Sequence, residues 1–544
     1  MKEPEIVSAT QAEIDELLVL AKTSFPPKQY KLLEGVLATF VYLMLKLQNA
    51  KTSLKRLQRM LFGHSTEHKQ DLLGLSAQGG VEAGLIAAGL VTPEVAATQT
   101  EASKKPRAPG HGRNAAADYS GAATVECNHT ELESGERCPK CEKGRVYESP
   151  PQSLVKVVGQ APLGATVYKL QRLRCRLCDA IFTAPLPAAV ASLPKYDSSC
   201  ASMIALLRYG SGMPHYRIEG LQASLYVPLP DSTQWDIVSK AVPAPRAVFE
   251  QLIVQAAQAP LLHNDDTPMR VLSLMAERAR MEADGVKPVR KAINTSGLVA
   301  VFGTHKVVLF FTGHDHAGKN MERVLAHRAQ ELQPVMQMCD ALAHNVAGEF
   351  KTVVANCLAH GRRQVGDVAE QFPEAARRVI EDLALVYKHD AQCRGEALSA
   401  EQRLAFHKEH SKPVMDGLHH WMSEHFEQHL VEPNSGLGKA LRYLLKHWEA
   451  LTLFLRLSGA PLDNNLCERA LKRAILHRKA SMFYKTVTGA EVGDVYMSLI
   501  HTCRLCDVNP LDYLNALQRH AGDVIASPAL WLPWNFPAQL SGGP

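Results

Sequence analysis

Carboxylate side chains stand beside three apolar segments that are far apart in the sequence. Asp265 and Asp266 follow "LLHN", and Asp340 follows "PVMQMC". Glu468 lies in a third segment, "LDNNLCERALKRAILHRK". Buried carboxylates repel one another and lose hydration, so a fold that gathers them needs a cation between them. Because Mg²⁺ and Mn²⁺ favour oxygen ligands, these residues predict a divalent metal site.

Strands must carry the two aspartates to a common edge. Apolar runs at 297–302 and 305–312, joined by a two-residue Gly-Thr turn, predict a β-meander after Asp265. A helix is predicted over 318–332, before the strand that ends on Asp340, and "KTVVANCL" predicts one more strand. The pattern indicates a mixed α/β domain.

A helix over 461–479 must supply the glutamate. Asp463 can cap this helix. Helical spacing predicts an apolar stripe of Leu466, Ala470, Leu471, Ala474 and Ile475. Glu468 falls at the margin of that stripe, so the helix can pack on a sheet while the carboxylate reaches the sheet's edge. Basic residues occupy the other side of the helix, which suits a phosphate backbone.

Two C-x-x-C pairs predict a structural zinc site. Their cysteines are Cys138, Cys141, Cys175 and Cys178. Two such knuckles on hairpins can present four thiolates as a closed tetrahedron, which predicts a zinc ribbon. The alternative is that these are reduced cysteines that merely pack. Twelve cysteines in 544 residues are too sparse for a disulfide scaffold.

The N-terminal half predicts helical and linker segments. Apolar residues from Leu33 to Leu61 alternate in steps of three and four, which favours a coiled coil over an intramolecular helical hairpin. Residues 76–118 lose periodicity and contain "KKPRAPGHGR", typical of a flexible basic tether that could also enter a minor groove. Residues 196–245 predict two helices, the second capped by Ser232, forming either a helix-turn-helix or a plain spacer.

Composition excludes several classes of protein. With 46% hydrophobic and 21% charged residues, the 544-residue chain indicates a soluble globular protein of several units. Its net charge of +5 permits a polyanionic partner without requiring one. The start lacks a signal-peptide core, and "GVLATFVYLML" is too short to span a bilayer. We therefore expect a cytoplasmic protein without a membrane partner.

The ordered set of motifs resembles the IS66 family of insertion-sequence transposases. It comprises "HNDDTPMRVL", "MCDALAHN", "NCLAHGRRQV", "LDNNLCERALKRAILHRK" and the terminal "WLPWNF". Further matches are "RLQRMLFGHSTEHK" at 56–69, "KYDSSCASMIALLRYG" at 195–210, the paired cysteines, "MSLIHTC" and "VNPLDYL". The resemblance covers essentially the whole chain.

The resemblance implies an RNase H-like catalytic domain with a DDE triad, interrupted before the glutamate by a helical insertion. Carried over by motif, the triad is Asp265, Asp340 and Glu468. The family pattern favours Asp265 over Asp266, a choice that strand alternation alone leaves open. Mg²⁺ or Mn²⁺ at the triad would support cleavage at the 3′ end of the element and strand transfer into target DNA, and the cysteines would bind structural Zn²⁺.

Nucleic acid is the expected partner. Six basic residues are candidates for holding phosphates, although each taken alone could be one half of a surface ion pair: His360, Arg362, Arg363, Lys472, Arg478 and Lys479. The resemblance implies double-stranded DNA partners, namely the terminal inverted repeats and the target. It also implies a homo-oligomeric synaptic complex, small accessory proteins of the element, and association with the bacterial nucleoid.

Some positions depart from the family pattern. Ala341 and Leu342 follow the second aspartate where Gly-Tyr is usual, although a subgroup carries the same "DAL" form. Ala480 follows Arg-Lys where Asn is usual, which could weaken activity, and Cys506 also replaces a common Asn. Two rival functions remain, a decayed DNA-binding relative that no longer cuts and an RNase H-like nuclease without strand transfer. The three intact carboxylates argue against decay.

The predicted protein is thus a multidomain α+β chain. Its expected parts are an N-terminal helical or coiled-coil region (1–75), a flexible basic linker (76–118), a zinc ribbon (119–188), a helical, helix-turn-helix-like DNA-binding segment (189–250), the RNase H-like domain (251–482) with a helical insertion at about 366–458, and a C-terminal helical tail (483–544).

Overall fold

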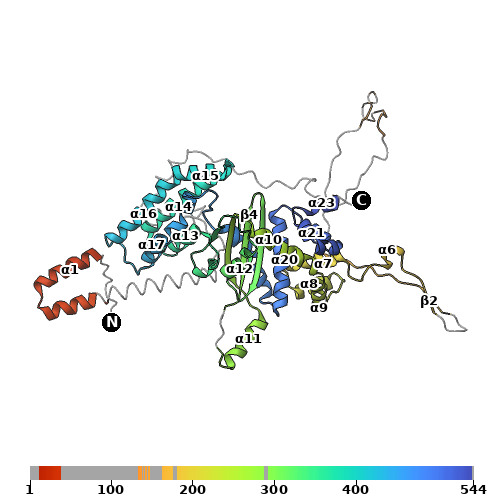
Figure 1. The fold of residues 1–544 in the computed structure, drawn as a ribbon, viewed down its shortest axis with the longest axis horizontal. Coiled ribbons are helices and arrows are strands. Elements are labelled where there is room, and N and C mark those ends of the chain that lie inside the picture. Colours follow the sequence, from red (N-terminus) through yellow and green to blue (C-terminus); the bar gives the residue numbers. More distant parts are fainter. Residues whose placement is uncertain are drawn as a thin grey trace. The chain divides into compact units, whose positions relative to one another are not determined.

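A computed structural model describes most of the chain. The described residues are 11–37, 39, 133–137, 139, 141, 143, 145–147, 162–174, 181–286 and 292–541. The chain divides into two compact units, one of residues 1–77 and 163–544 and the other of residues 78–162. The larger unit contains the main sheet and most of the helices (Figure 1).

A five-stranded mixed sheet forms the centre of the larger unit. Its strands are β3 (Leu261–Pro268), β4 (Asn294–Phe302), β5 (His305–Gly313), β6 (Met336–Cys339) and β7 (Val353–Asn356). They lie in the order β5-β4-β3-β6-β7. The first three are antiparallel neighbours, whereas β6 runs parallel to β3 and β7 parallel to β6. The predicted meander is confirmed, with a turn in which Gly303 has a φ of +56°.

Helices cover both faces of this sheet (Figure 1). On one face lie α19 (Asn465–Ser481) and α20 (Val487–Leu505), with Cys467 against Gly297 and His501 stacked on Phe310. The other face carries α10 (Pro243–Ala257) and α12 (Ala317–Leu325), with Phe249 packed on Phe311. Because successive side chains of a strand point to opposite faces, Phe310 and Phe311 meet different helices.

Helix α20 accepts hydrogen bonds from the backbone N–H groups at the outer edge of the sheet. Its residues Asp494, Ser498 and Thr502 are spaced by four, so they lie on one side of the helix. Their side-chain oxygens accept the backbone N–H groups of Thr312 (2.6 Å), Phe310 (2.9 Å) and Val308 (3.0 Å), respectively. Unpaired N–H groups on an edge strand invite pairing with another chain, so this helix closes the β5 edge.

A helical insertion follows β7. Its helices are α13 (Leu358–Gly366), α14 (Pro373–Gly395), α15 (Ala400–Phe406), the π-helix η4 (His407–Ser411), α16 (Lys412–Glu427), α17 (Gly436–Lys446), α18 (Trp448–Leu451) and the 3-10 helix η5 (Leu453–Leu455). Buried apolar residues such as Leu383, Leu418 and Leu441 give it a hydrophobic core of its own. The chain then continues into α19.

Helix α12 ends earlier than predicted. The helical pattern over 318–332 is interrupted after Leu325, where turns begin. The guanidinium of Arg328 donates hydrogen bonds to the carbonyl oxygens of Ala257 and Ala259 at 2.6 and 2.8 Å, and to that of Gln333 at 2.7 Å. These tertiary hydrogen bonds hold the chain against the end of α10 instead of extending α12.

Short helices precede and follow the sheet. Before it come α6 (Ala188–Ala191), α7 (Ser198–Ala205), the π-helix η2 (Leu206–Gly210), α8 (His215–Ser224) and α9 (Asp231–Lys240). After α20 come α21 (Pro510–Arg519), α22 (Ala521–Ala526), the 3-10 helix η6 (Pro528–Trp531) and α23 (Phe536–Ser541). The predicted Ser232 cap is wrong, because α9 starts at Asp231 after Pro230 and Ser232 lies inside its first turn.

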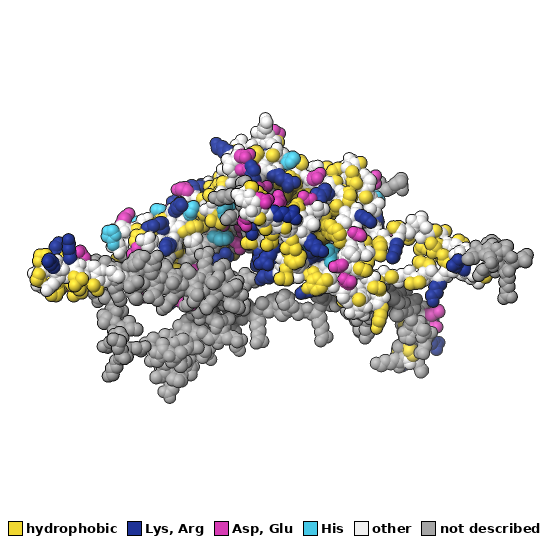
Figure 2. All heavy atoms as spheres, turned by 90° about the horizontal axis from the view of Figure 1, so that it is seen from below, with side chains coloured by type: hydrophobic (Ala, Val, Ile, Leu, Met, Phe, Trp, Pro, Cys, Tyr) yellow, Lys and Arg dark blue, Asp and Glu magenta, His cyan; other side chains and the backbone are white. Residues whose placement is uncertain are grey.

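The N-terminal region contains α1 (Gln11–Ser24) and a second helical segment over residues 27–37. Apolar side chains lie on the surface of these helices (Figure 2), with Val19 67% and Leu32 70% exposed. The predicted coiled-coil seam beyond residue 39 and the linker at 76–118 lie outside the described residues. None of the described helices is both long and apolar enough to cross a bilayer.

The residues that flank each C-x-x-C pair form antiparallel pairs with one another. In the smaller unit, Arg137 and Arg145 form an antiparallel bridge around the segment that contains Cys138 and Cys141. In the larger unit, β1 (Arg172–Arg174) pairs with β2 (Ile181–Thr183) around the segment that contains Cys175 and Cys178. Three of these cysteines lie outside the described residues, and the described one, Cys141, is exposed.

Candidate active site

Three elements bring the predicted carboxylates together. Asp265 lies on β3, Asp340 immediately follows β6, and Glu468 is in the first turn of α19. Strands β3 and β6 are parallel neighbours, so their C-terminal ends meet at one edge of the sheet. The charges of Asp340 and Glu468 both act on the carboxyl of Asp265 and raise its pKa.

A glycine lets α19 approach Asp265 closely. Gly297 on β4 is the register partner of Asp265 on β3. A Cβ atom at Gly297 would lie 2.9 Å from the side chain of Leu471 and 3.6 Å from Sγ of Cys467, both on α19. A side chain at this position would therefore displace the Leu471 side chain or the helix that carries it. Gly297 thus allows close packing of the turn that follows Glu468 against β4.

The pKa of Asp265 is raised to about 7. Burial is the largest cause, and the charges of Asp340, Glu468 and Asp266 also raise this pKa. One hydrogen bond, donated by the backbone N–H of Asp266 at 2.8 Å, lowers it. The carboxyl therefore lies beside further carboxylates, and together they offer the oxygen donors that a divalent cation favours.

Asp266 faces the opposite side of the sheet and already has partners. Its carboxylate accepts hydrogen bonds from the hydroxyl of Ser296 at 2.6 Å and from the backbone N–H of Ala317 at 2.9 Å. Nδ1 of His316 lies 3.4 Å from the same carboxylate. Asp266 therefore anchors the start of α12 to β3, whereas Asp265 lies with the other two carboxylates.

A buried amide network holds the loop that begins with Asp340. Nδ2 of Asn345 donates to the Asp340 carboxylate at 2.5 Å. The carbonyl oxygen of Asn345 accepts hydrogen bonds from Asn264 and Gln337, each at 2.7 Å. All three amide residues are almost fully buried. These residues were not predicted from the sequence, although amides within apolar strands were a signal, since buried polar groups need partners.

A second missed pair fixes the start of α19. Asn464 is fully buried, and its Oδ1 lies 3.0 Å from Nδ1 of His263. Its Nδ2 donates to the carbonyl oxygen of Asn264 at 3.0 Å. The first turn of α19 is therefore bonded directly to β3. The predicted cap, Asp463, accepts the backbone N–H of Asn465 at 3.1 Å, while Asn464 occupies the N-cap position.

Two of the six predicted phosphate ligands contact Glu468. Nδ1 of His360, on α13, lies 3.6 Å from Oε1 of Glu468. A guanidinium nitrogen of Arg363, one turn later on α13, lies 3.8 Å from Oε2. These side chains surround the glutamate with donors and positive charge on the side of the helical insertion.

The other four predicted phosphate ligands have different environments. Arg362 lies over the ring of Tyr387 in the insertion, 5.4 Å from its centroid. Arg478 donates to the carbonyl oxygen of Pro268 and, at 3.3 Å, to the hydroxyl of Thr267, so it ties α19 to the end of β3. Lys479 is exposed and Lys472 is partly exposed on α19. Basic side chains are spread among apolar and acidic ones on the face shown in Figure 2.

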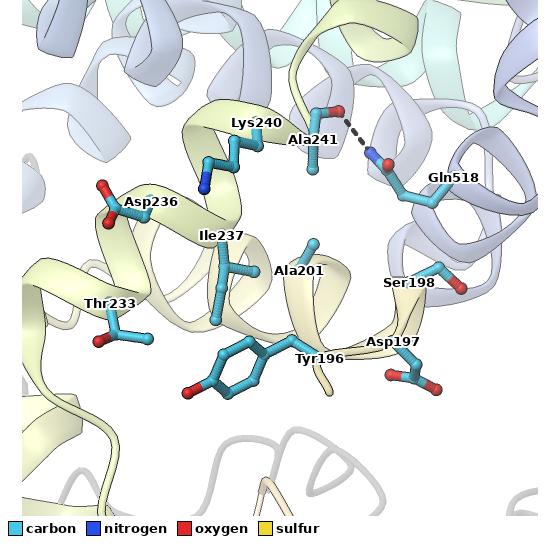
Figure 3. Close-up of a pocket in the computed structure, with 10 residues that line it drawn as sticks. All are labelled: Tyr196, Asp197, Ser198, Ala201, Thr233, Asp236, Ile237, Lys240, Ala241 and Gln518. Atoms are coloured by element: carbon cyan, nitrogen blue, oxygen red, sulfur yellow. Dashed lines mark hydrogen bonds between the residues drawn. The ribbon is translucent and has the colours of Figure 1, made fainter. Parts of the chain in front are cut away.

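A cavity of about 390 Å³ lies away from the carboxylates. Helices α7, α9 and α21 surround it, and Gln518 of α21 donates to the carbonyl oxygen of Ala241 at 2.7 Å (Figure 3). Its polar lining includes Asp197, Asp236 and Lys240. None of the sequence-predicted site residues lines this cavity, so the carboxylate cluster is the better candidate for chemistry.

Comparisons with known proteins agree with these motifs. Residues 195–492 match the family model described as "Transposase IS66 family". This range includes all three carboxylates and the helical insertion.

Similar proteins from Sinorhizobium fredii are uncharacterized. The protein y4hP is 27% identical over 390 residues, which cover 67% of this chain and 67% of the relative. The protein y4jD is 26% identical over 384 residues, covering 68% and 72%, respectively. A third, y4qI, is 30% identical over 208 residues, which cover 37% of this chain and 38% of the relative.

Proposed function

The chain belongs to the IS66 family of transposases, and from this premise we propose that it cleaves and joins DNA at a site formed by Asp265, Asp340 and Glu468. The single observation that carries the proposal is the convergence of three carboxylates from β3, β6 and α19, with the pKa of Asp265 raised to about 7. Family membership supports a DNA-processing role, and this cluster is where we assign the chemistry.

The sheet supports an RNase H-like catalytic domain. Its three antiparallel strands followed by two parallel ones, in the order β5-β4-β3-β6-β7, are the arrangement that we expect of such a domain. The carboxylates come from its central strand, from the adjacent parallel strand and from a helix on one face. The insertion between β7 and α19 matches the expected interruption before the glutamate.

The donor set fits a divalent cation. Three converging carboxylates would hold Mg²⁺ or Mn²⁺ through oxygen atoms alone, as these ions prefer. Such ions would stabilise the charge that develops on a scissile phosphate and favour deprotonation of the attacking hydroxyl. The protein's own contribution is to position its ligands: Asn345 orients Asp340, and Asn464 anchors the first turn of α19.

The proposed reaction has two steps at this site. In the first, water attacks a phosphorus atom at the element end, the bond to the 3′ oxygen breaks, and a 3′-hydroxyl is released. In the second, that hydroxyl attacks a phosphodiester of the target, and the target's own 3′ oxygen leaves. Arg363 and the exposed Lys479 are our first candidates for holding the phosphate backbone, because both are cationic and lie on the elements that frame Glu468.

The remaining parts have proposed roles in assembly. The exposed apolar side chains of residues 17–36 support self-association of the N-terminal helices, as a complex that pairs two element ends requires. The four paired cysteines are proposed to bind structural Zn²⁺ on the basis of their spacing. We propose the terminal inverted repeats and target DNA as partners, with accessory proteins of the element as additional ones.

The test is a cleavage and joining assay with Mg²⁺ on a labelled duplex that carries the element's own end. A blunt duplex tests cleavage, and a pre-cut duplex with a free 3′-hydroxyl tests joining separately. We expect both activities in the wild-type chain and neither in Glu468→Gln, with DNA binding retained in both. Cleavage without joining would favour a nuclease, and binding without either would favour a decayed relative.

A further inference from the structure

A second group of potential metal ligands lies beside the carboxylate cluster. Cys357, His360 and Glu468 each offer one ligand atom, and these atoms all lie within 4.8 Å of one another. Cys357 immediately precedes α13, His360 is in the first turn of α13, and Glu468 is in the first turn of α19. The group therefore spans the junction between the helical insertion and the helix that carries the glutamate.

Two of the three ligand atoms are buried without a hydrogen-bond partner among the described residues. They are Nδ1 of His360 and Oε1 of Glu468, which lie 3.6 Å apart. Buried polar atoms in native proteins are nearly always satisfied, so two adjacent exceptions need an explanation. An ion between them would satisfy both atoms at once.

The third ligand is a thiol beside a helix N-terminus. Cys357 is completely buried, and its Sγ accepts the backbone N–H of Asn464 at 3.2 Å. Asn464 occupies the N-cap position of the 17-residue α19. Burial raises the pKa of this thiol to about 12, although the backbone N–H of Asn464 lowers it. A bound metal ion would itself favour the thiolate, which is the form of cysteine that binds metals.

We propose that Cys357, His360 and Glu468 form a second metal site, selective for Zn²⁺ and similar thiophilic ions. Sulfur, imidazole nitrogen and carboxylate oxygen are typical Zn²⁺ ligands, whereas Mg²⁺ takes oxygen. Tetrahedral Zn²⁺ requires ligand atoms separated by roughly 3.3–3.6 Å. The His360–Glu468 separation already meets that requirement, and the sulfur needs a shift on the order of 1 Å.

Because this site shares Glu468 with the carboxylate cluster, Zn²⁺ bound here would inhibit the DNA chemistry. This consequence rests on the proposed function. A Zn²⁺ ion held by Cys357 and His360 would draw the Glu468 carboxylate towards α13 and away from Asp265 and Asp340. Binding would release the thiol proton to solvent, since the ligand is the thiolate. Zn²⁺ and catalytic Mg²⁺ would then compete for one carboxylate.

The first test measures binding without any DNA chemistry. The full chain is titrated with Cd²⁺ while near-ultraviolet thiolate-to-metal absorption is recorded, and bound Zn²⁺ is counted by equilibrium dialysis. Wild type is compared with Cys357→Ser, His360→Gln and Asp265→Asn. Cys393→Ser, which removes a buried cysteine of the insertion, is the matched control. The C-x-x-C cysteines contribute equally to all five proteins.

We expect wild type, Asp265→Asn and Cys393→Ser to bind one more ion per chain than Cys357→Ser. His360→Gln should bind that ion at least about tenfold more weakly. Equal absorption and equal stoichiometry in wild type and Cys357→Ser would overturn the proposal. Circular dichroism checks folding. If Cys357→Ser does not fold, a Zn²⁺ affinity of His360→Gln equal to that of wild type would overturn the proposal instead.

The second test measures Zn²⁺ inhibition of Mg²⁺-dependent cleavage. Each variant is compared with its own Zn²⁺-free activity. We expect Cys357→Ser to need at least about tenfold more Zn²⁺ than Cys393→Ser for half inhibition. Equal sensitivity would overturn the inhibitory role. If no protein cleaves DNA, the proposed function fails, while the Cd²⁺ titration still decides whether the site exists.

Discussion

Two buried carboxyl groups on opposite sides of β4 have similarly raised pKa values but different partners. The pKa of Asp265, on β3, and that of Asp494, on α20, are both raised to about 7, in each case chiefly by burial. Asp494 receives hydrogen bonds from the backbone N–H of Thr312 at 2.6 Å and from its hydroxyl at 2.7 Å, and these bonds lower its pKa. Asp265 instead has Asp340 and Glu468 beside it.

The difference separates a structural carboxyl group from one that is free to bind a ligand. At Asp494 the two acceptor oxygens are used by the edge of the sheet, and Ser498 continues the same contact. Asp265 accepts one backbone hydrogen bond, from Asp266, and its charged neighbours Asp340 and Glu468 are carboxylates. A raised pKa by itself therefore does not identify a functional residue, because the partners decide whether the group can bind a cation.

The largest expected effect distinguishes these two groups by activity. Asp265→Asn should lower cleavage by roughly 10³-fold or more, because a metal ligand is removed while the shape is kept. Asp494→Asn should remain within about threefold of wild type, since its amide oxygen can still accept the N–H of Thr312. Single-turnover cleavage of the element end measures both. A larger loss in Asp494→Asn than in Asp265→Asn would break the comparison.

The second effect tests whether the position of α19 matters at the Asp265 site. Gly297→Ala places a methyl group 2.9 Å from Leu471 and should displace the helix. We expect cleavage to fall on the order of 10²-fold, because small displacements of catalytic groups are costly.

The double variant Gly297→Ala/Leu471→Ala is the control for this prediction. Removing the larger side chain should restore part of the activity, measured in the same assay. No recovery together with an unfolded circular dichroism spectrum would show that Gly297 serves stability alone.

The third effect tests the structural role of α20. Ser498→Ala removes the acceptor of the Phe310 N–H and leaves that buried group unpaired. The free energy of unfolding should fall by about 1–3 kcal/mol, with cleavage retained where the protein is folded. Urea denaturation measures this change. The matched control is Ser239→Ala, which removes an exposed hydrogen bond within α9; a loss no larger than that of the control would contradict the role.

The smallest effect is a pH dependence without metal. Both carboxyl groups keep their protons to about pH 7 when folded and lose them near pH 4 when unfolded. Folded protein then binds more protons, so these groups make the free energy of unfolding decrease between about pH 4 and 7. Asp265→Asn should reduce this decrease. Mg²⁺ should stabilise wild type and Asp494→Asn at pH 8 but leave Asp265→Asn unchanged, as measured by thermal unfolding.

Much of the sheet could be predicted from local sequence. The alternating and continuous apolar runs of β4 and β5, with the Gly303 turn between them, specify a hairpin without help from distant residues. The helical insertion was expected from the family resemblance rather than from local sequence. The end of α12 was not, because Arg328 binds carbonyl groups far away in the sequence.

The sequence indicated the carboxylates of the candidate site more clearly than the residues that hydrogen-bond to them or to their strands. The spacing and resemblance indicated Asp265, Asp340 and Glu468, and the structure assigns Asp266 to a hydrogen-bonded contact with α12. Asn345 and Asn464 gave only a weak signal, since their partners lie in other strands. Arg478 was predicted as a phosphate ligand, yet its guanidinium donates to the backbone at the end of β3.

The sequence by itself determined the elements, since hydrophobic periodicity and turn residues act over a few neighbouring positions. It also determined which side chains could do chemistry. Only the tertiary structure decided which of them meet: Gly297 leaves room for the Leu471 side chain of α19, and the pKa of Asp265 rises through burial and through the charges of Asp340 and Glu468. Burial and electrostatic interaction depend on distances between segments that local sequence does not encode.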